Sequence, residues 1–264
     1  MNANTSSPKV IWDYTEHASH YDKRADYSYD AIKDLVAAMG CVPGTPVADI
    51  GAGTGKLTKE LLKQGLTVKS VEPNDAMRAI GIQNTNGKSG TWSVGTGEAT
   101  GLPTSSVYAV CFGSSFNVVD QSLALLEVTR ILVPNGWFTC MWNHRDLDDP
   151  IQQKVESIIK SSIPTYSYGL RREDPTNAIN ASGYFSEAKS IERSFVWEMP
   201  RSDIVVAWKS HATLRRQAGS PSIFDRIIKE ISKYMDSLPE QIDVPYTTRI
   251  YFAQMTKEKN GLTS

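Results

Sequence analysis

The stretch from Val47 to Gly55 combines one acidic side chain, Asp49, with glycines at alternate positions. Apolar and small residues surround Asp49, which is typical of a buried parallel strand. Residues 56–62 then carry apolar side chains at helical spacing. A glycine turn between a strand and a helix allows a nucleotide or nucleoside to approach the backbone closely. The pattern therefore predicts the first half of a nucleotide-binding βαβ unit.

The residues around this turn favour a ligand without a pyrophosphate. A phosphate-binding P-loop would need a glycine in place of Ile50 and a hydroxyl residue in place of Leu57. The dinucleotide fingerprint would need a third glycine in place of Lys56. Glu72 ends the next predicted strand, 66–72, about 20 residues beyond the first glycine, where an acid can accept hydrogen bonds from both ribose hydroxyls. A nucleoside fits this arrangement best.

These residues resemble motifs of the class I S-adenosylmethionine-dependent methyltransferases. Residues 47–55 look like the first motif of that family and residues 71–77 like its second. Residues 130–136 and the loop 142–146 are similar to landmarks of the ubiquinone/menaquinone-biosynthesis C-methyltransferases and of small-molecule enzymes like them. The resemblance covers residues 14–146. It implies a Rossmann-like α/β fold with a seven-stranded, mostly parallel sheet, one antiparallel strand, and a helical lid inserted in the C-terminal part.

The resemblance also implies the cofactor, S-adenosyl-L-methionine, which leaves as S-adenosyl-L-homocysteine. We expect Glu98 beside the adenine amine and the turn 113–120 beside the reacting methyl group. The expected cofactor-binding residues are Tyr14, Tyr21, Asp49, Gly51, Ala52, Gly53, Gly55, Glu72, Pro73, Asn74, Met77, Gly97, Glu98, Ala99, Ser114, Ser115 and Phe116.

The acceptor chemistry is harder to predict. Relatives often carry His and an aromatic residue where this chain has Asn117 and Val118, so their chemistry cannot be transferred. Methyl transfer from a sulfonium is an in-line displacement, and a hydroxyl acceptor also needs a base. His144 and His211 are the candidate catalytic bases, because the other histidines belong to the predicted N-terminal helix. Ligands of an open α/β sheet lie beyond the carboxyl ends of its strands, which places Arg145 at the substrate mouth. The expected substrate-binding residues are Tyr14, Asn117, Asn143, Tyr166, Tyr168, Trp208 and His211.

The chain divides into six predicted parts. We expect a disordered tail over 1–9, N-terminal helices covering the active site over 10–40, and the cofactor-binding core over 41–146. A helix and lid loop follow over 147–186, then the last strands with inserted lid helices over 187–255, and a tail over 256–264. Asp30 is expected to cap the helix 31–39. Helices over 203–217 and 222–235 are expected to form the lid.

Composition limits the classes of partner. The 264-residue chain has 40% hydrophobic residues and a net charge of −1. Balanced charge disfavours nucleic acid, and no apolar run is long enough to span a bilayer. Three unclustered cysteines suit a reducing cytoplasm and form no zinc pattern. We therefore expect a cytoplasmic monomer or homodimer that uses no metal and binds neither nucleic acid nor membrane.

Methyl transfer to a nitrogen or oxygen of a small biosynthetic or secondary metabolite is the favoured function. Carbon methylation of the quinone-biosynthesis type stays open because of the subgroup resemblance. An NAD(P)-dependent oxidoreductase, an RNA or protein methyltransferase and a non-catalytic cofactor-binding partner are the alternatives from other classes.

Overall fold

The computed structural model describes residues 21–86, 90–168 and 173–256. Within them the chain forms a seven-stranded sheet with the strand order β3-β2-β1-β4-β5-β7-β6. The strands are β1 (Pro46–Ile50), β2 (Thr67–Val71), β3 (Gly90–Ser93), β4 (Val107–Gly113), β5 (Leu132–Arg145), β6 (Lys189–Pro200) and β7 (Gln241–Gln254). Only β7 among them runs antiparallel to its neighbours, β5 and β6. The expected Rossmann-like, mostly parallel sheet is confirmed.

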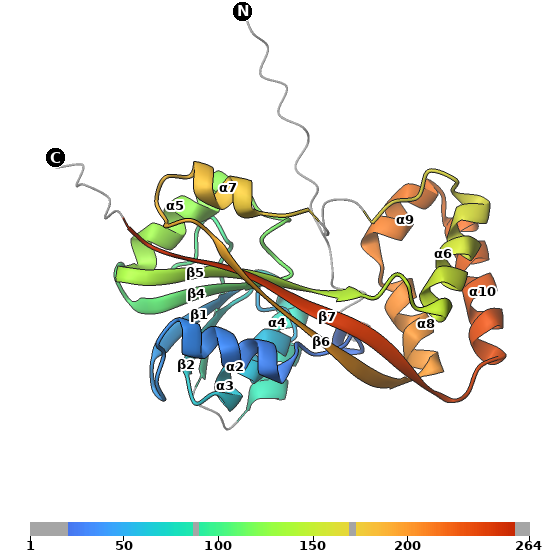
Figure 1. Ribbon diagram of the computed structural model, residues 1–264, viewed down its shortest axis with the longest axis horizontal. Helices are drawn as coiled ribbons and strands as arrows, with labels where there is room; N and C mark the ends of the chain where they lie inside the picture. The colour runs from blue at the N-terminus through green and yellow to red at the C-terminus, as the bar shows by residue number, and fades with distance from the viewer. Residues whose placement is uncertain (1–20, 87–89, 169–172, 257–264) are drawn as a thin grey trace, which may run out of the picture.

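Helices cover both faces of the sheet (Figure 1). The helices are α2 (Tyr29–Ala38), α3 (Lys56–Lys63), α4 (Asp75–Thr85), α5 (Gln121–Ile131), α6 (Pro150–Ser162), α7 (Thr176–Ala181), α8 (Arg201–Lys209), α9 (Ala212–Ala218) and α10 (Pro221–Asp236). Apolar side chains of α2 and α3 pack on one face, and those of α5 and α7 pack on the other. Alternate residues of β4 supply both cores, with Cys111 on the α2 side and Phe112 on the α5 side. A strand buried on both faces must be apolar throughout, as β4 is.

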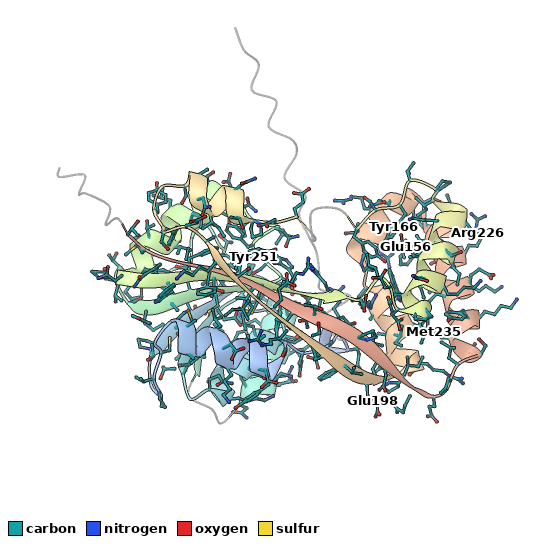
Figure 2. All side chains as sticks on the ribbon, viewed as in Figure 1. Glu156, Tyr166, Glu198, Arg226, Met235 and Tyr251 are labelled. Atoms are coloured by element: carbon teal, nitrogen blue, oxygen red, sulfur yellow. The ribbon has the colours of Figure 1, made fainter. Side chains whose placement is uncertain are left out.

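The helices α6, α8, α9 and α10 form a separate cluster, which we call the helical subdomain (Figure 1). Its core contains Trp208 and Ile231, both fully buried, and the aromatic ring of Tyr166 (Figure 2). Ile242 and Val244 at the start of β7 are buried in the same core. The long strands β6 and β7 therefore connect the helical subdomain to the sheet.

Three local predictions differ from the structure. Helix α2 begins at Tyr29, so its cap is Ser28, whose Oγ accepts from Ala31 N at 3.3 Å, and Asp30 lies inside the first turn. The predicted helix 203–217 is two helices, because the chain turns at His211 and starts again with α9. Helix α7 was not predicted. The N-terminal prediction for residues 1–20, including Tyr14, lies outside the described residues.

Within the described ranges, no helix combines the length and the apolar character needed to cross a membrane.

Candidate active site

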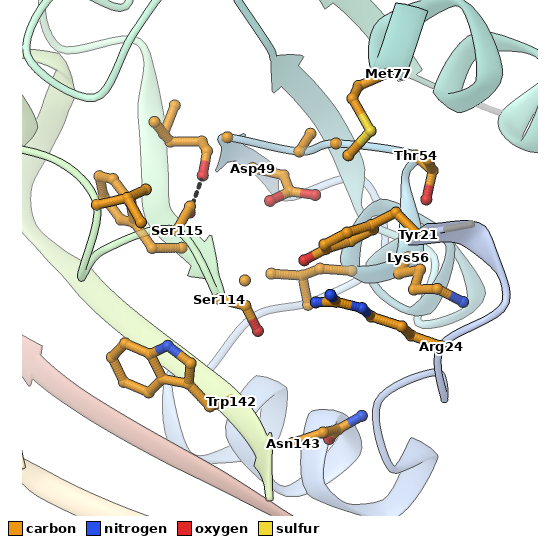
Figure 3. Close-up of a pocket in the computed structure, with 18 of the residues that line it drawn as sticks. Tyr21, Arg24, Asp49, Thr54, Lys56, Met77, Ser114, Ser115, Trp142 and Asn143 are labelled. Carbon is orange, nitrogen blue, oxygen red and sulfur yellow. Dashed lines mark hydrogen bonds between the residues drawn. The ribbon is translucent and has the colours of Figure 1, made fainter. Parts of the chain in front are cut away.

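A cavity of about 460 Å³ lies at the carboxyl ends of the parallel strands. Its wall comes from the N-terminal segment before α2, the turns after β1 and β4, and the ends of β2 and β5 (Figure 3). Tyr168, Ala207 and His211 add a wall from the helical subdomain and the segment beside it. A volume of this size is typical of a small-molecule site. The fold thus places one continuous cavity between the glycine turn and the helical subdomain.

The glycine turn after β1 leaves no space for a side chain. Gly51 has φ +67°, and a Cβ built on it would lie 2.6 Å from the Cβ of Ser115. The backbone N–H groups of Gly51 and Ala52 both donate to Val71 O, at 2.9 and 3.1 Å. These bonds fix the turn against the end of β2 and bring the first motif beside the second.

Glu72 connects the two motifs through its carboxylate. Oε2 accepts from Gly53 N at 2.8 Å, and Oε1 accepts from Asn74 N at 2.8 Å. Burial raises the pKa of Glu72, although these two N–H groups and the nearby Arg78 oppose the shift. A carboxylate offers about four acceptor sites, so two backbone bonds leave capacity for ribose hydroxyls. Glu72 can therefore hold the turn and a nucleoside together.

Asp49 supplies a second buried acceptor. Its Oδ2 accepts from Thr58 Oγ1 at 2.6 Å, whereas Oδ1 is buried and has no hydrogen-bond partner among the described residues. Burial raises the pKa of Asp49 to about 7, the Thr58 hydroxyl opposes this shift, and Glu72 adds to it. Asp49 lies in the wall of the cavity (Figure 3). A buried carboxylate oxygen of this kind suits a cationic ligand group.

The turn after β4 is fixed in a conformation that is unusual for residues with side chains. Ser114 has φ +60°. Its Oγ lies 2.9 Å from the hydroxyl of Tyr27, and Ser115 Oγ donates to Ile50 O at 2.6 Å. Positive φ costs energy in a non-glycine residue and is often found at functional sites. The two hydrogen bonds hold this turn against β1 and against the N-terminal segment.

The segment before α2 is held over the cavity by polar contacts. Asn143 Nδ2 donates to Asp26 O at 2.8 Å, while its Oδ1 accepts from Thr248 Oγ1 at 2.6 Å. The carboxylate of Asp26 pairs with Lys56 at 2.8 Å and with Lys59 at 3.3 Å. Burial raises the pKa of Asp26, but these two ammonium groups lower it more and hold it below its usual value. Asn143 thus both lines the cavity and holds its cover.

Most of the expected site residues line the cavity. They are Tyr21, Asp49, Gly51, Ala52, Gly53, Glu72, Pro73, Asn74, Met77, Gly97, Glu98, Ser114, Ser115, Asn143, His144, Tyr168 and His211. Their contacts with a ligand stay predictions.

Six expected residues are described but lie outside the cavity wall: Gly55, Ala99, Phe116, Asn117, Tyr166 and Trp208. Phe116 packs in the sheet core against Phe112 and Phe138, with ring centroids 5.4 and 5.1 Å away. Trp208 is fully buried in the helical subdomain. Asn117 lies behind the wall, where its Oδ1 accepts from Trp142 Nε1 at 3.2 Å.

Sequence reasoning missed several residues that line the cavity, among them Arg24, Tyr27 and Tyr246. No motif marks Arg24 or Tyr27, which become relevant only because Asn143 and Ser114 hold their segment over the sheet. Tyr246 lies on β7, where buried and half-buried residues alternate, and this pattern indicates only a core side chain. In the part of the chain that is described, no group of three His, Cys, Asp or Glu side chains could hold a metal ion.

Comparison with known proteins supports the class that this geometry indicates. Residues 48–140 match the family model described as a methyltransferase domain. An uncharacterized methyltransferase of Mycobacterium tuberculosis is 37% identical over 127 residues, which are 47% of this chain and 48% of that protein. A ubiquinone/menaquinone biosynthesis C-methyltransferase of Caulobacter vibrioides is 30% identical over 166 residues, 56% of this chain and 65% of that protein.

A solved structure extends the likeness to the fold. Phosphoethanolamine N-methyltransferase 2 of Haemonchus contortus, in complex with S-adenosyl-L-methionine, has a TM-score of 0.52 at 14% identity and covers 95% of this chain and 61% of its own. The matched domain and the sheet order make the chain similar to the class I S-adenosylmethionine-dependent methyltransferases. The cofactor of this class is S-adenosylmethionine. The match spans only about half of the length of the mycobacterial relative.

Proposed function

We propose that this protein transfers the methyl group of S-adenosylmethionine to a nitrogen or oxygen atom of a small organic molecule. The observation that carries the proposal is the single cavity that joins the turn of Gly51 and Glu72 to a wall from the helical subdomain. When bound, the cofactor would supply an electrophilic methyl group on a sulfonium. Because the cavity extends beyond the glycine turn, a second molecule can be held on the far side of that methyl group.

The residues of this chain suit each part of the cofactor. Glu72 would accept hydrogen bonds from the ribose, and the buried Oδ1 of Asp49 would accept from the methionine ammonium group. Glu98 would contact the adenine amine. Its Oε1 accepts from Asp120 N at 3.0 Å, and this hydrogen bond holds the carboxylate in place. Gly51 matters because a side chain there would occupy the space of the nucleoside or displace Ser115.

The contribution of the protein to the reaction would be positioning. Holding two reactants in line can supply several kcal/mol, on the order of 7 or more in favourable cases. The helical subdomain and the segment held by Asn143 exclude water from that geometry. For a hydroxyl acceptor, His144 and His211 are the candidate bases in the cavity wall. Carbon methylation stays the alternative, favoured by the Caulobacter relative, whose own name is that of a C-methyltransferase.

The test has a binding arm and an activity arm. Calorimetry should show that S-adenosylhomocysteine binds the wild-type protein. In Glu72→Ala its affinity should fall by about 100-fold, because the backbone and ribose hydrogen bonds to a charged group are lost together. Glu198→Ala, which changes an exposed residue of β6, is the matched control. Methyl transfer from labelled cofactor into fractionated metabolite extract, read by mass spectrometry, should then identify the acceptor. Equal affinity for both variants would contradict the assignment of the nucleoside site.

A further inference from the structure

Residues 22–28, which we call the strap, lie over the cavity and lead into α2. From Lys23 onward the strap forms neither helix nor strand. Lys23 is exposed, whereas the next residue, Arg24, lines the cavity and extends into it (Figure 3). Ala25 and Tyr27 line the cavity as well. A single segment of chain therefore separates this part of the cavity from solvent.

Each residue of the strap has a polar contact with another part of the chain. In order from Asp22 to Ser28, the partners are Asn84 of α4, Asp203 of α8, Ser210, Asn143 of β5, Lys56 and Lys59 of α3, Ser114 and Thr248 of β7. Asp203 and the α8 cap Ser210 belong to the helical subdomain, whereas the other partners belong to the sheet and its helices. The strap thus joins the two walls of the cavity.

Polar contacts rather than apolar burial hold the strap in place. Only Ala25 and Tyr27 among its residues are buried apolar or aromatic side chains, with 6% and 9% exposure. Water can replace a hydrogen bond or an exposed ion pair when a segment moves away, so each such contact adds little net stability. Segments with few buried apolar contacts open locally while the rest of the domain stays folded. The strap has this property.

Asp26 makes the best protected polar contacts of the strap. Its Oδ1 lies 2.8 Å from Lys56 Nζ, and its Oδ2 lies 3.3 Å from Lys59 Nζ. The side chains of Asp26 and Lys56 are 17% and 10% exposed, so solvent screens this pair less than the pair of Lys23 and Asp203, whose lysine is 54% exposed. Asp26 itself does not line the cavity, so its effect on a ligand must pass through the strap.

Lys56 connects this ion pair to the nucleoside end of the cavity. It stands where the dinucleotide fingerprint has its third glycine, at the first position of α3 directly after the glycine turn. Its side chain is buried, lines the cavity and pairs with Asp26. The turn that would hold the cofactor and the segment that covers it are therefore joined by one ion pair.

From these contacts we propose that the strap is a gate for the cofactor, and that the ion pairs of Asp26 with Lys56 and Lys59 are the latch that keeps this gate closed. The inference rests on the proposed function, because it concerns the exchange of S-adenosylmethionine and S-adenosylhomocysteine at the same site. The latch joins side chains of the chain itself, so it forms alike in the free and the occupied protein. It therefore slows entry and exit of the cofactor by the same factor and leaves the equilibrium affinity unchanged.

Exchange kinetics test the gate. The full-length protein is loaded with radiolabelled S-adenosylhomocysteine and chased with the unlabelled compound, and association is followed separately by rapid mixing. Asp26→Asn, which removes the charge and keeps the shape, should speed both dissociation and association by about 10-fold, while the dissociation constant changes by less than about 3-fold. Asp26→Glu keeps the charge and should restore most of the slow exchange. Raising the salt from about 0.05 M to about 0.5 M should speed exchange in the wild type but not in Asp26→Asn.

Asp34→Asn is the matched control, because it removes the same charge from an ion pair with Arg193 that lies away from the cavity wall. Unchanged exchange rates in Asp26→Asn would overturn the proposal. So would faster dissociation without faster association, because that result assigns Asp26 to support of the bound cofactor rather than to a gate. Failure of the proposed function would appear instead as absent S-adenosylhomocysteine binding in the wild type. If Asp26→Asn does not fold, Lys59→Met, at a residue outside the cavity wall, gives the same comparison with a smaller effect.

Discussion

Replacement of Asp49 by asparagine should stabilise the protein at alkaline pH and yet weaken cofactor binding. The folded pKa of Asp49, about 7, lies above its ordinary value of 3.8 because the carboxyl is buried. Between these two values the folded chain binds more protons at Asp49 than the unfolded chain does. The ionisation of Asp49 therefore opposes folding increasingly as the pH rises through this window, and its contribution is constant above it.

The magnitude follows from the shift. About three pKa units correspond to at most about 4 kcal/mol, of which about 2.5 kcal/mol develops between pH 5 and pH 8. Asparagine keeps an acceptor for Thr58 but buries an amide, which costs about 1–3 kcal/mol at any pH. From pH 5 to pH 8, the wild type should thus lose about 2.5 kcal/mol of unfolding free energy relative to Asp49→Asn.

Urea denaturation of both proteins at pH 5 and pH 8 measures this difference. Asp243→Asn, the same change at an exposed position of β7, should show little dependence on pH and is the control. Calorimetry with S-adenosylmethionine should show at least about a 10-fold loss of affinity for Asp49→Asn at pH 8, because a charged acceptor is lost. A difference in stability that is the same at both pH values would refute the raised pKa. Unchanged cofactor affinity would refute the assignment of Oδ1 to the ammonium group.

Three further substitutions test the geometry of the site. Gly51→Ala should lower the unfolding free energy by about 1–3 kcal/mol and weaken S-adenosylhomocysteine binding. The new Cβ would clash with Ser115, and the backbone at this position is left-handed. A variant as stable as wild type would contradict this explanation. Asn143→Ala should leave the melting temperature nearly unchanged but speed hydrogen exchange of residues 25–28, because Asn143 holds this segment. Unchanged exchange would show that other contacts suffice. His211→Ala should cost about 1 kcal/mol by removing the cap of α9, while His211→Ser should retain most of that stability, and equal losses in a thermal melt would argue against the cap.

The cofactor half of the site could be predicted from sequence because it depends on local patterns. The strand before Gly51, the helix after it and the acid at the end of β2 all follow from residue type and short-range spacing. Residue type and position left both Asn74 and Asp75 as possible caps of α4, and the structure shows Asn74, whose Oδ1 accepts from Met77 N at 3.0 Å. These features need no knowledge of tertiary contacts.

The substrate half could not be predicted as well, because distant contacts build it. The break between α8 and α9 arises at His211, a residue type that rarely caps a helix and that gives no start signal. Phe116 was expected in the site from its position after β4, yet the aromatic core beneath the sheet takes its side chain. Arg24 reaches the helical subdomain through its bond to Ser210 O at 2.8 Å, a contact across 186 positions of sequence that no periodicity reveals.

The position of β7 in the sheet also bears on how the protein is synthesised. β6 pairs only with β7 in the described sheet, although α8, α9 and α10 separate the two strands along the chain. During translation, β6 therefore emerges without a partner, and β5 stays an open sheet edge, until residues 241–254 leave the ribosome. Open edges invite pairing with other chains. We expect nascent chains that stall before Gln241 to require a chaperone, while strands β1 to β5, which carry the proposed nucleoside site, fold first.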